Sequence, residues 1–558
     1  MAGKYYKKYP PDPRFERADC ECLCGEWDFA FADADCENPV FDKKIIVPYS
    51  YECEASGIGD TSAHGCVWYR RKFNVKRTDG AVLLKFEAVD YECSIYINGE
   101  FAGGHIGGFT GFCLDITALV GEGENEIRVK VLDSFDKSQL RGKQRARQES
   151  YECWYVQTTG IWKPVRIEYA GGVYIKKMDI AARGDGRVTV VAELSAPAPF
   201  RFCAEGERGV VCDICTGQSD KHTLQFWVEE PKLWSADTPY LYSVKAVAGE
   251  EMGDTVKSYF AFCDVRAKED GLYINGRREY QQMILYQGYW LDSMLTAPDD
   301  ISIERDIDAI KAMGFNGVRV HQKIENDIFY YLCDKKGLYV FGEIPSAYEF
   351  TERMKSEFSR DCGLIFEQLK NHVCISCWLL FNETWGVYGI NEDREQQNYI
   401  EGLAAKLRGL DPRPVITNDG WYHLDSDILS LHEYEQDAEV FSREYRDKDY
   451  VVGGKIINTL GTAFAKGYSY SGQPVFISEY GGIAISGKGW GYGESAPDSG
   501  SYERRLRDIV GAVTSTPYVS GCCYTQFNDT QQEINGLLDA RRNAKLPFET
   551  IKKIFAVK

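Results

Sequence analysis

Two glutamates follow very apolar segments in the second half of the chain. Glu383 comes directly after CWLLFN, and Glu479 comes directly after VFIS. Burial disfavours the charged form of a carboxylate, so such an acid is expensive unless it is paired. Two of them supply what glycosidic cleavage needs: one acid protonates the leaving oxygen and a second carboxylate attacks or stabilises the anomeric carbon. The pair therefore favours a sugar-cleaving site. The alternative is a structural ion pair of either glutamate with Arg319.

Other polar or aromatic residues end neighbouring apolar segments. Aromatic rings match the apolar faces of a sugar, and amides and charged groups match its hydroxyls. Any one of these residues alone is more often a packing residue, but their recurrence at successive segment ends favours one shared site. In chain order they are Arg319, His321, Glu343, Asn382, Asp419, Trp421, His432, Tyr434, Tyr524 and Gln526.

The segments that carry these residues alternate with stretches of helical length. SIERDIDAIKAMG places Ile303, Ile307, Ile310 and Met313 at spacings of three and four and ends at Gly314, which predicts a helix. Eight strands with intervening helices predict a (β/α)8 barrel, whose active site is built at the C-terminal ends of the strands. The predicted strands are QMILYQG, FNGVRVH, LYVFGEI, ISCWLLFNE, PVITNDG, ILSLHEY, VFISEYG and GCCYTQFND.

The first half of the chain reads as short strands separated by turns. Tight turns at Asn98-Gly99 and at residues 121–123 favour antiparallel pairing and therefore a β-sandwich. The pattern repeats on a smaller scale in the next segment, whose length suits one immunoglobulin-like sandwich. We therefore expect three domains: a sandwich over 1–170, an immunoglobulin-like sandwich over 171–266 and the barrel over 267–558.

Composition excludes several classes of protein. The 558 residues are several times the usual length of one domain, about 100–200 residues. With 65 basic and 84 acidic residues the net charge is -19, which argues against binding nucleic acid through its phosphates. No apolar run suits a signal peptide or a membrane span. The 19 cysteines, many in apolar runs, are read as reduced buried side chains of a cytoplasmic protein.

Motifs along nearly the whole chain resemble glycoside hydrolase family 2, the family of β-galactosidases, β-glucuronidases and β-mannosidases. The first domain contributes CGEWDFAF, VWYRRKF, YINGEFAGGHIGGFTGFCLDIT and TTGIWKPVRIE; the second contributes PKLWSADTPYLYSV; the barrel contributes GFNGVRVHQ, FYYLCDKKGLYVFGEIP, CWLLFNETWG and FISEYGG. The resemblance implies a jelly-roll sugar-binding domain, an immunoglobulin-like β-sandwich and a C-terminal TIM barrel, in that order.

The resemblance also implies roles for the site residues. Glu383 would be the acid/base and Glu479 the nucleophile of a retaining mechanism. Asn382 would hydrogen-bond the 2-hydroxyl of the sugar, and Arg319 would lie near Glu479 and keep it ionised. The residues that would line the sugar subsite are His321, Glu343, Asp419, Trp421, His432 and Tyr434.

Two departures from the family bear on the substrate. Tyr524 stands where many relatives place a tryptophan that floors the subsite. β-Glucuronidases typically carry an Asn-x-Lys pair after this strand, and the corresponding stretch here, Glu533-Ile534-Asn535-Gly536, lacks the lysine. Asn543-Ala544-Lys545 has the right residues but lies further along. These differences favour a β-galactosidase-like specificity, with a uronide held by other basic residues as the alternative.

The remaining motifs add no cofactor. Residues 482–488 spell a P-loop up to its lysine, but Gly489 replaces the Ser or Thr that would hold magnesium, so a glycine-rich active-site loop is the simpler interpretation. We expect a cytoplasmic exo-β-glycosidase that needs no cofactor or metal and acts on a small glycoside or oligosaccharide. Neither nucleic acid nor a membrane is an expected partner, and assembly into a homo-oligomer is left open. A carbohydrate-binding protein without catalysis is the alternative from another class.

Overall fold

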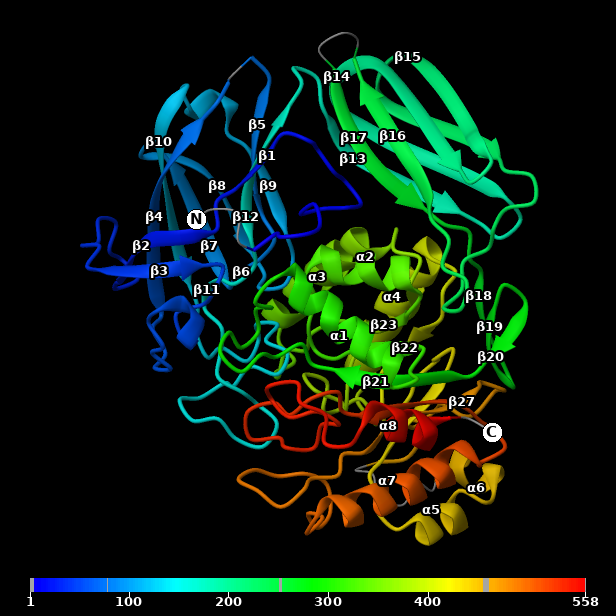
Figure 1. The fold of residues 1–558 in the computed structure, drawn as a ribbon. Helices are drawn as coiled ribbons and strands as arrows, with labels where there is room; N and C mark the ends of the chain where they lie inside the picture. Colours follow the sequence, from blue (N-terminus) through cyan, green and yellow to red (C-terminus); the bar gives the residue numbers. More distant parts are fainter. Residues whose placement is uncertain (1–4, 78, 250–252, 455–460, 557–558) are drawn as a thin grey trace.

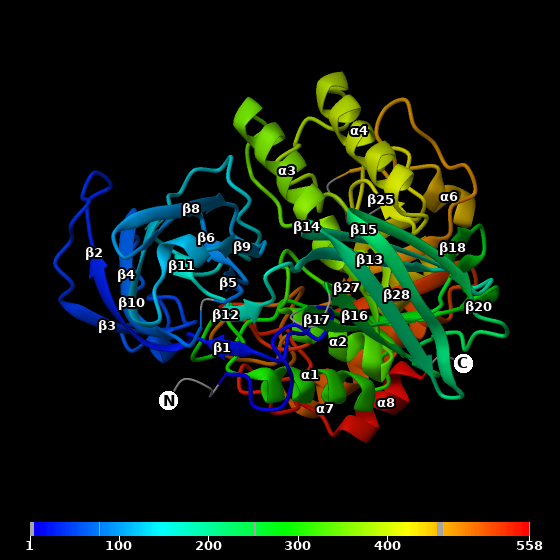
Figure 2. The same cartoon turned by 90° about the horizontal axis from the view of Figure 1, so that it is seen from above.

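A computed structural model describes residues 5–77, 79–249, 253–454 and 461–556. Two β-sandwiches, one blue and one green to teal, lie above a barrel that is surrounded by helices (Figure 1). Seen from above, the N-terminal sandwich lies to one side of the barrel (Figure 2). The expected fold class is confirmed, with a sugar-binding-type sandwich, an immunoglobulin-like sandwich and a TIM barrel in chain order.

The N-terminal sandwich packs two antiparallel sheets around one apolar core. Inward residues alternate with outward ones along its strands, as in Gly123–Leu132, so that side chains such as Trp27 and Tyr69 are buried between the sheets. One sheet has the order β3 (Lys43–Val47), β2 (Gly25–Phe31), β4 (Cys66–Val75), β10 (Gly123–Leu132), β7 (Glu92–Ile97) and β8 (Glu100–Ile106). The other has the order β1 (Cys20–Cys22), β12 (Val165–Ala170), β5 (Ala81–Phe86) and β9 (Phe112–Asp115), and β6 (Val89–Asp90) pairs with β11 (Gly160–Ile161).

The second sandwich is antiparallel and packs on the barrel. Its strands are β13 (Ile175–Ala182), β14 (Arg187–Gly206), β15 (Gly209–Trp227), β16 (Tyr242–Ala248) and β17 (Asp254–Phe260). The amide of Ile180 donates to Asn371 Oδ1 at 3.1 Å, and Lys370 Nζ lies 3.0 Å from Asp179 Oδ2. A small sheet of β18 (Val265–Lys268), β19 (Gly271–Ile274) and β20 (Arg277–Glu279) then leads into the barrel. Leu272 of this sheet packs on the side chains inside the barrel, so it closes the end opposite the site.

All eight strands predicted for the barrel are present and run parallel. In chain order they are β21 (Gln281–Tyr286), β22 (Gly317–Val320), β23 (Tyr339–Glu343), β24 (Ile375–Leu379), β25 (Val415–Ile416), β26 (Leu429–Glu433), β27 (Val475–Gly481) and β28 (Val519–Thr525). Their order in the sheet is β25-β24-β23-β22-β21-β28-β27-β26, and an isolated bridge between Gly420 and Leu431 joins the two ends. The strands are buried on both faces, which is why they read as continuous apolar runs.

Helices surround the barrel. The predicted first helix is observed as α1 (Asp300–Ala312), where the Asp299 side chain caps the amide of Ser302 and Ile303, Ile307 and Ile310 are buried. The others are α2 (Asp327–Lys336), α3 (Glu352–Leu369), α4 (Arg394–Leu410), α5 (Ala438–Glu444), α6 (Lys448–Val452), α7 (Ser499–Thr514) and α8 (Phe548–Phe555). None of the described helices has the length and apolar character that crossing a membrane requires.

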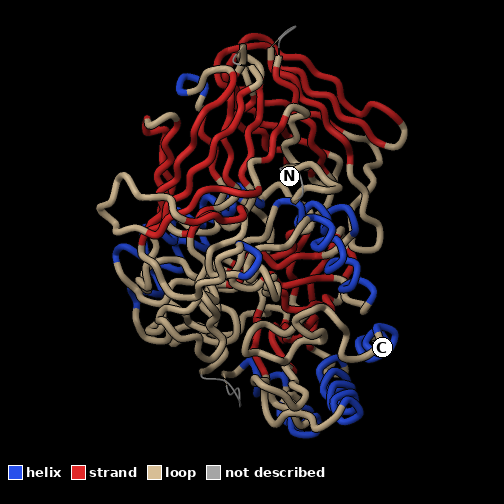
Figure 3. Tube along the Cα trace, turned by 60° about the vertical axis from the view of Figure 1, so that its left-hand side comes forward, coloured by secondary structure: helices blue, strands red, loops and turns tan. Residues whose placement is uncertain are grey.

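A long segment of the first sandwich reaches the barrel mouth. Residues 133–159, between β10 and β11, form this inserted loop, which runs as a cyan trace beside the barrel loops in Figure 1. The amides of Arg141 and Gly142 donate to the Ser346 carbonyl at 2.9 and 3.1 Å. Gly142 has φ +58°, and a Cβ there would lie 2.1 Å from the Gln322 carbonyl oxygen, so only glycine fits. These contacts place the inserted loop against the barrel loop that contains Ser346. Figure 3 shows that loops, drawn in tan, form a large region beside the strands of the barrel.

Candidate active site

Glu383 and Glu479 meet at the C-terminal end of the barrel. Glu383 lies in the loop after β24, and Glu479 lies on β27. A carboxylate oxygen of each, together with a ring nitrogen of His432, falls within a group whose atoms are all within 4.8 Å of one another. The side chain of Glu383 is 23% exposed and that of Glu479 is 6% exposed. The two acids therefore face one small space that opens to solvent beside Glu383.

The backbone around Glu383 is held in an unusual conformation. Glu383 and Thr384 have φ angles of 48° and 62°, in the left-handed region that side chains disfavour. The amide of Glu383 donates to the Asp419 carbonyl at 3.0 Å, and the amide of Thr384 donates to Asn418 Oδ1 at 3.0 Å. The polar residues after β25 thus position Glu383 through its main chain.

Glu479 is surrounded by donors. Arg319 Nη1 lies 2.7 Å from Oε1, His432 Nε2 lies 3.5 Å from the same oxygen, and the Tyr434 hydroxyl donates to Oε2. Burial alone would raise the pKa of this carboxyl, but the charges of His432 and Arg319 lower it to about 2. Glu479 is therefore ionised at neutral pH, as a nucleophile must be.

Arg319 connects three strand ends beneath the glutamates. Its fully buried guanidinium places Nε 2.8 Å from Glu343 Oε2 and Nη1 2.7 Å from Asp419 Oδ2, while Nη2 donates to Asn382 Oδ1 at 2.6 Å. This contact fixes the orientation of the Asn382 amide. Its Nδ2 is buried and has no hydrogen-bond partner in the described structure. A buried N–H₂ without a partner is available to a hydroxyl of a bound sugar.

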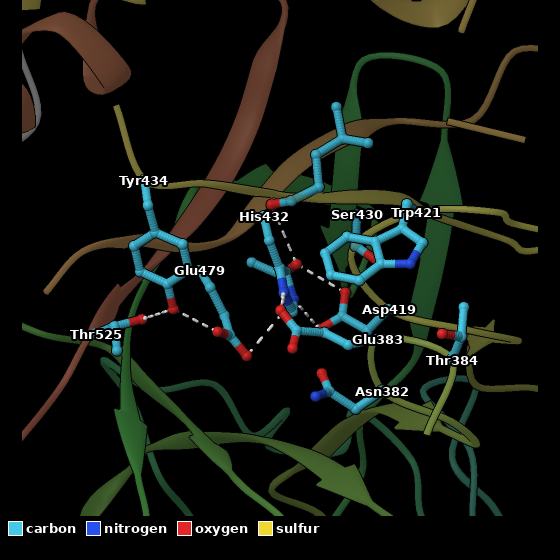
Figure 4. A network of polar contacts seen from close by, with 12 residues as sticks. Asn382, Glu383, Thr384, Asp419, Trp421, Ser430, His432, Tyr434, Glu479 and Thr525 are labelled. Atoms are coloured by element: carbon cyan, nitrogen blue, oxygen red, sulfur yellow. Dashed lines mark hydrogen bonds and ion pairs between the residues drawn. The ribbon is translucent and has the colours of Figure 1, made fainter. Parts of the chain in front are cut away.

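His432 links Glu383 to Asp419. Its Nδ1 lies 2.7 Å from Glu383 Oε1 and its Nε2 lies 3.1 Å from Asp419 Oδ2 (Figure 4). Burial alone would lower the pKa of His432, but the charges of Glu479 and Asp419 raise it to about 10. The ring is therefore protonated at neutral pH, and both ring nitrogens donate. Gly420 lies directly against this ring, since a Cβ there would be 3.0 Å from it, and Trp421 packs edge-on with ring centroids 5.8 Å apart. His432 therefore lies between the two glutamates, 2.7 Å from Glu383 Oε1 and 3.5 Å from Glu479 Oε1.

His321 and Glu343 form the neighbouring wall. His321 Nδ1 lies 3.2 Å from Glu343 Oε2 and 3.2 Å from Arg319 Nη2. Burial lowers the pKa of His321. Burial alone would raise the pKa of Glu343, but the charge of Arg319 lowers it below its ordinary value. The histidine is therefore neutral beside an ionised carboxylate. The ring of Trp385, two residues after Glu383, has its centroid 6.0 Å from that of His321.

The other wall contains residues that sequence reasoning missed. Tyr434 stacks on Tyr492, with ring centroids 3.3 Å apart, and the Tyr434 hydroxyl lies 3.1 Å from Thr525 Oγ1. The amide of Tyr492 donates to the Gly482 carbonyl at 2.8 Å, so the glycine-rich stretch after β27 lies at the active site. Figure 4 shows Tyr434 and His432 approaching Glu479 from opposite sides. The sequence predicted a glycine-rich active-site loop at residues 482–488, but nothing in the sequence pointed to Tyr492, which follows that stretch.

One predicted site residue faces away. Tyr524 packs against Tyr480 and against Phe555 of α8, with centroid distances of 5.5 and 5.4 Å, so it belongs to the layer between barrel and helices. The neighbouring Cys523 faces the barrel interior instead. Because side chains alternate along a strand, Tyr524 cannot also reach the sugar. The expectation that Tyr524 lines the subsite is therefore wrong, and Thr525 is the strand-end residue that reaches Tyr434.

Gln526 belongs to a second polar group at the same mouth. Gln287, after β21, donates from Nε2 to Gln526 Oε1 at 2.5 Å, and Gln526 donates from Nε2 to Asn535 Oδ1 at 2.6 Å. All three side chains are buried. Strand β28, which ends before Gln526, lies between β21 and β27, so this group lies on the Glu479 side of the site.

Two sets of described residues bring three potential metal ligands within 4.8 Å of one another. One is Glu383, His432 and Glu479, each of which already has protein hydrogen bonds. The other is Asp334, His372 and Cys374. There, the Asp334 carboxylate is satisfied by His372 Nδ1, the Cys374 amide and a tyrosine hydroxyl, and burial raises the pKa of the Cys374 thiol. Neither arrangement requires an ion, and the absence of a metal stays a prediction.

Comparison with known families finds three matches in chain order. The model described as "Glycosyl hydrolases family 2, sugar binding domain" matches residues 40–168, "Glycosyl hydrolases family 2" matches 203–262, and "Glycosyl hydrolases family 2, TIM barrel domain" matches 296–497. The third match contains Arg319 and both glutamates, and the first contains the whole inserted loop.

Curated relatives carry names with two specificities. A putative β-glucuronidase of Formosa agariphila is 26% identical over 66% of this chain and 46% of its own length. A β-galactosidase of Thermoanaerobacter pseudethanolicus is 29% identical over 70% of this chain and 52% of its own length. This chain therefore spans about half the length of these two relatives. A β-glucuronidase of Paenibacillus borealis is 24% identical over 79% of this chain and 78% of its own length.

Solved structures share the whole fold. A β-glucuronidase from an uncultured Clostridium species superposes with a TM-score of 0.78 at 21% identity, covering 99% of this chain and 100% of that one. A β-galacturonidase from Eisenbergiella tayi superposes with a TM-score of 0.74 at 18% identity, covering 98% of each chain. At this level of identity the likeness concerns the fold.

Proposed function

Because the chain belongs to glycoside hydrolase family 2, we propose that it is a retaining exo-β-glycosidase that removes a terminal β-linked monosaccharide. The observation that carries this proposal is the approach of Glu383 and Glu479, whose nearest ligand oxygens lie within 4.8 Å across the barrel mouth. Retaining enzymes hold their two carboxyl groups about 5–5.5 Å apart, whereas inverting enzymes hold them about 6.5–9.5 Å apart to admit a water. The short separation supports retention.

In the first step Glu479 attacks the anomeric carbon. Its carboxylate is ionised because Arg319 and His432 lower its pKa to about 2, so no proton has to be removed beforehand. As the bond from Glu479 to carbon forms, the bond from carbon to the leaving oxygen breaks, and Glu383 gives its proton to that oxygen. The more exposed position of Glu383 suits contact with the leaving group.

In the second step water releases the sugar. The ionised Glu383 takes a proton from the water, whose oxygen attacks the anomeric carbon while the bond to Glu479 breaks. Two inversions return the sugar with its original configuration. The unpaired Nδ2 of Asn382 is placed to bind the 2-hydroxyl, a contact that strengthens in the transition state.

The specificity that we propose is β-galactosidase-like. The missing Asn-x-Lys pair at Glu533-Ile534-Asn535 supports it, as does the relative named β-galactosidase. A β-hexuronidase is the second candidate, because other relatives and structural neighbours are named β-glucuronidase or β-galacturonidase. A non-catalytic carbohydrate-binding protein is the third. The presence of both glutamates and Asn382 argues against that third candidate.

The test is a panel of 4-nitrophenyl β-glycosides, including galactoside, glucoside, mannoside, glucuronide and galacturonide. It is assayed with the wild type, Glu383→Ala and Glu479→Ala. We expect the wild type to release 4-nitrophenol from at least one glycoside and both variants to lose this activity. A 2-deoxy-2-fluoro glycoside of the best substrate should add one sugar mass to the Glu479 peptide, and NMR should show the β-anomer forming first. Full activity of Glu479→Ala, or no release from any glycoside, would refute the proposal.

A further inference from the structure

The inserted loop carries a buried lysine to the sugar site. The Lys143 side chain is only 8% exposed, although it comes from the first sandwich and not from the barrel. Its Nζ lies 5.6 Å from the ring centroid of Trp385 and 5.7 Å from that of Tyr155. Burial would lower its pKa, but nearby acidic groups, including Glu533 and Glu479, raise it, so the ammonium is charged.

The closest acid to this ammonium is Glu533, in the loop after β28. Nζ lies 3.8 Å from Glu533 Oε2, which is longer than an ammonium–carboxylate hydrogen bond. The same carboxylate oxygen accepts from Gln287 Nε2 at 3.0 Å and from the Tyr155 hydroxyl. The pair therefore joins two domains. Its separation leaves donor capacity on Lys143 for a further oxygen atom.

Polar atoms around this pair lack partners in the described part of the chain. They are Gln287 Oε1, Asn535 Nδ2 and the Tyr289 hydroxyl, all on side chains at most 5% exposed. Buried polar atoms are normally hydrogen-bonded, so several unpaired ones in one place mark a site for a polar ligand. The group follows strands β21 and β28, and β28 pairs with β27, which carries Glu479.

The charges around the two glutamates are unfavourable for an acidic sugar. Arg319 and His432 supply two cations, and Glu343, Asp419 and Glu479 supply three anions, because the pKa values of all three carboxyls are lowered. Lys143 adds a positive charge. Burial raises the pKa of Glu533, while the nearby charge of Lys143 lowers it. When Glu533 is ionised, a sugar carboxylate would thus enter a pocket in which the anions outnumber the cations. A sugar hydroxyl, by contrast, can accept a hydrogen bond from an ammonium and donate one to a carboxylate at the same time.

We propose that Lys143 and Glu533, brought together from two domains, are specificity-determining residues that bind glycone hydroxyls and select a neutral sugar over the corresponding uronic acid. The inference rests on the proposed function and names the substrate class of the same site. Glu533 provides the discrimination, because its carboxyl group faces Lys143 at 3.8 Å and, when ionised, cancels the charge of the ammonium and repels a carboxylate.

The experiment compares substrates that differ only at C6. The ratio of kcat/KM for 4-nitrophenyl β-galactoside to that for 4-nitrophenyl β-galacturonide is measured, together with the glucoside and glucuronide pair. The wild type is expected to favour the neutral member of the better pair. Glu533→Gln, which removes the charge at every pH, should lower this ratio about tenfold or more. Lys143→Met should raise KM for the neutral substrate about tenfold or more.

The control is Lys163→Met, another buried lysine of the first sandwich, whose Nζ donates to the Glu325 carbonyl at 3.1 Å. A purely structural effect changes both substrates equally and leaves the ratio intact, which is the result expected for Lys163→Met. A wild type that prefers the uronide, or an unchanged ratio in Glu533→Gln, would overturn the inference while the proposed glycosidase function stands. If the wild type cleaves no glycoside, the proposed function itself fails.

Discussion

Arg319 Nη1 lies 2.7 Å from Oε1 of Glu479, and the arginine side chain is completely buried. The same nitrogen also contacts the carboxylate of Asp419, and Nε contacts that of Glu343. One guanidinium thus contacts the proposed nucleophile and two further carboxylates. Without this cation three acids would lie close together in a buried part of the barrel mouth, where like charges raise one another's pKa values. Arg319 thus offsets the repulsion among the three carboxylates and keeps Glu479 ionised.

Replacing Arg319 by Gln is expected to move the acid limb of kcat/KM upward. In the wild type Glu479 loses its proton at a pKa of about 2, so this group produces no acid limb near neutrality. Removing the cation should raise that pKa by about 1–3 units, so activity should fall as the pH drops below about 5, where Glu479 of the wild type is still ionised. The measurement is a pH–rate profile of the wild type, Arg319→Gln and Arg319→Lys.

Arg319→Gln should also lower the free energy of unfolding by about 3–5 kcal/mol, as expected when one partner of a buried ion pair is removed. The charge-retaining Arg319→Lys variant is the control for folding and should show a smaller shift of the acid limb. An acid limb in Arg319→Gln identical to that of the wild type would contradict this role.

Replacing Glu383 by Gln should affect poor leaving groups far more than good ones. A general acid contributes about 10²–10⁴-fold when the leaving oxygen needs a proton, but a dinitrophenolate leaves without one. We expect a loss of that size in kcat/KM for an alkyl glycoside and a much smaller loss for the dinitrophenyl glycoside. Added azide should restore turnover and yield the β-glycosyl azide. Equal losses for both substrates would argue that Glu383 is not the acid.

Asn382→Ala should lose activity only where the sugar has a 2-hydroxyl. The amide is oriented by Arg319 at 2.6 Å and presents an unpaired Nδ2. We expect kcat/KM for the parent glycoside to fall about 10²-fold, in line with a transition-state contact of a few kcal/mol. The 2-deoxy glycoside should lose less than about tenfold. Similar losses for the two substrates would mean that the residue acts on the fold and not on the sugar.

Two tyrosines offer a matched pair of Tyr→Phe changes. Tyr434→Phe removes a donor to Glu479, so we expect kcat/KM to fall about tenfold, the size of a hydrogen bond to a charged group. Tyr524→Phe removes a buried hydroxyl from a ring that packs against Tyr480 and Phe555, away from the glutamates, so activity should stay within about twofold. A large loss in Tyr524→Phe would reinstate Tyr524 at the subsite.

Glu52→Gln should make the protein more stable in alkaline buffer. Burial raises the pKa of this carboxyl to about 8, although hydrogen bonds from Ser50 and from nearby backbone amides oppose the shift. Because the pKa of Glu52 is higher in the folded state than in the unfolded state, where it is about 4.5, the protonated acid contributes fully to stability below pH 4.5. That contribution is lost as the pH rises through 8. The apparent Tm of Glu52→Gln should therefore exceed that of the wild type at pH 9 and differ little at pH 4. A constant difference across this range would contradict the assignment.

Local sequence predicted the barrel well, because its strands are short, buried on both faces and followed by residues that do not suit a core. Glu383, Glu479 and His432 stood out for that reason, and the structure gathers them at one mouth. The same reasoning wrongly placed Tyr524 at the sugar subsite. GCCYT is apolar on both faces, so nothing in it says which side chains point into the barrel, and a shift of one residue exchanges the two faces.

The order of domains, the eight strands and the two acids were thus readable from the chain alone, since each depends on neighbours in sequence. The group around Lys143 was not. Lys143 and Glu533 lie in different domains and far apart along the chain, and only the packing of the inserted loop on the barrel, where Gly142 meets the Gln322 carbonyl, brings them 3.8 Å apart. Contacts between distant segments are decided by tertiary packing, and they complete this site.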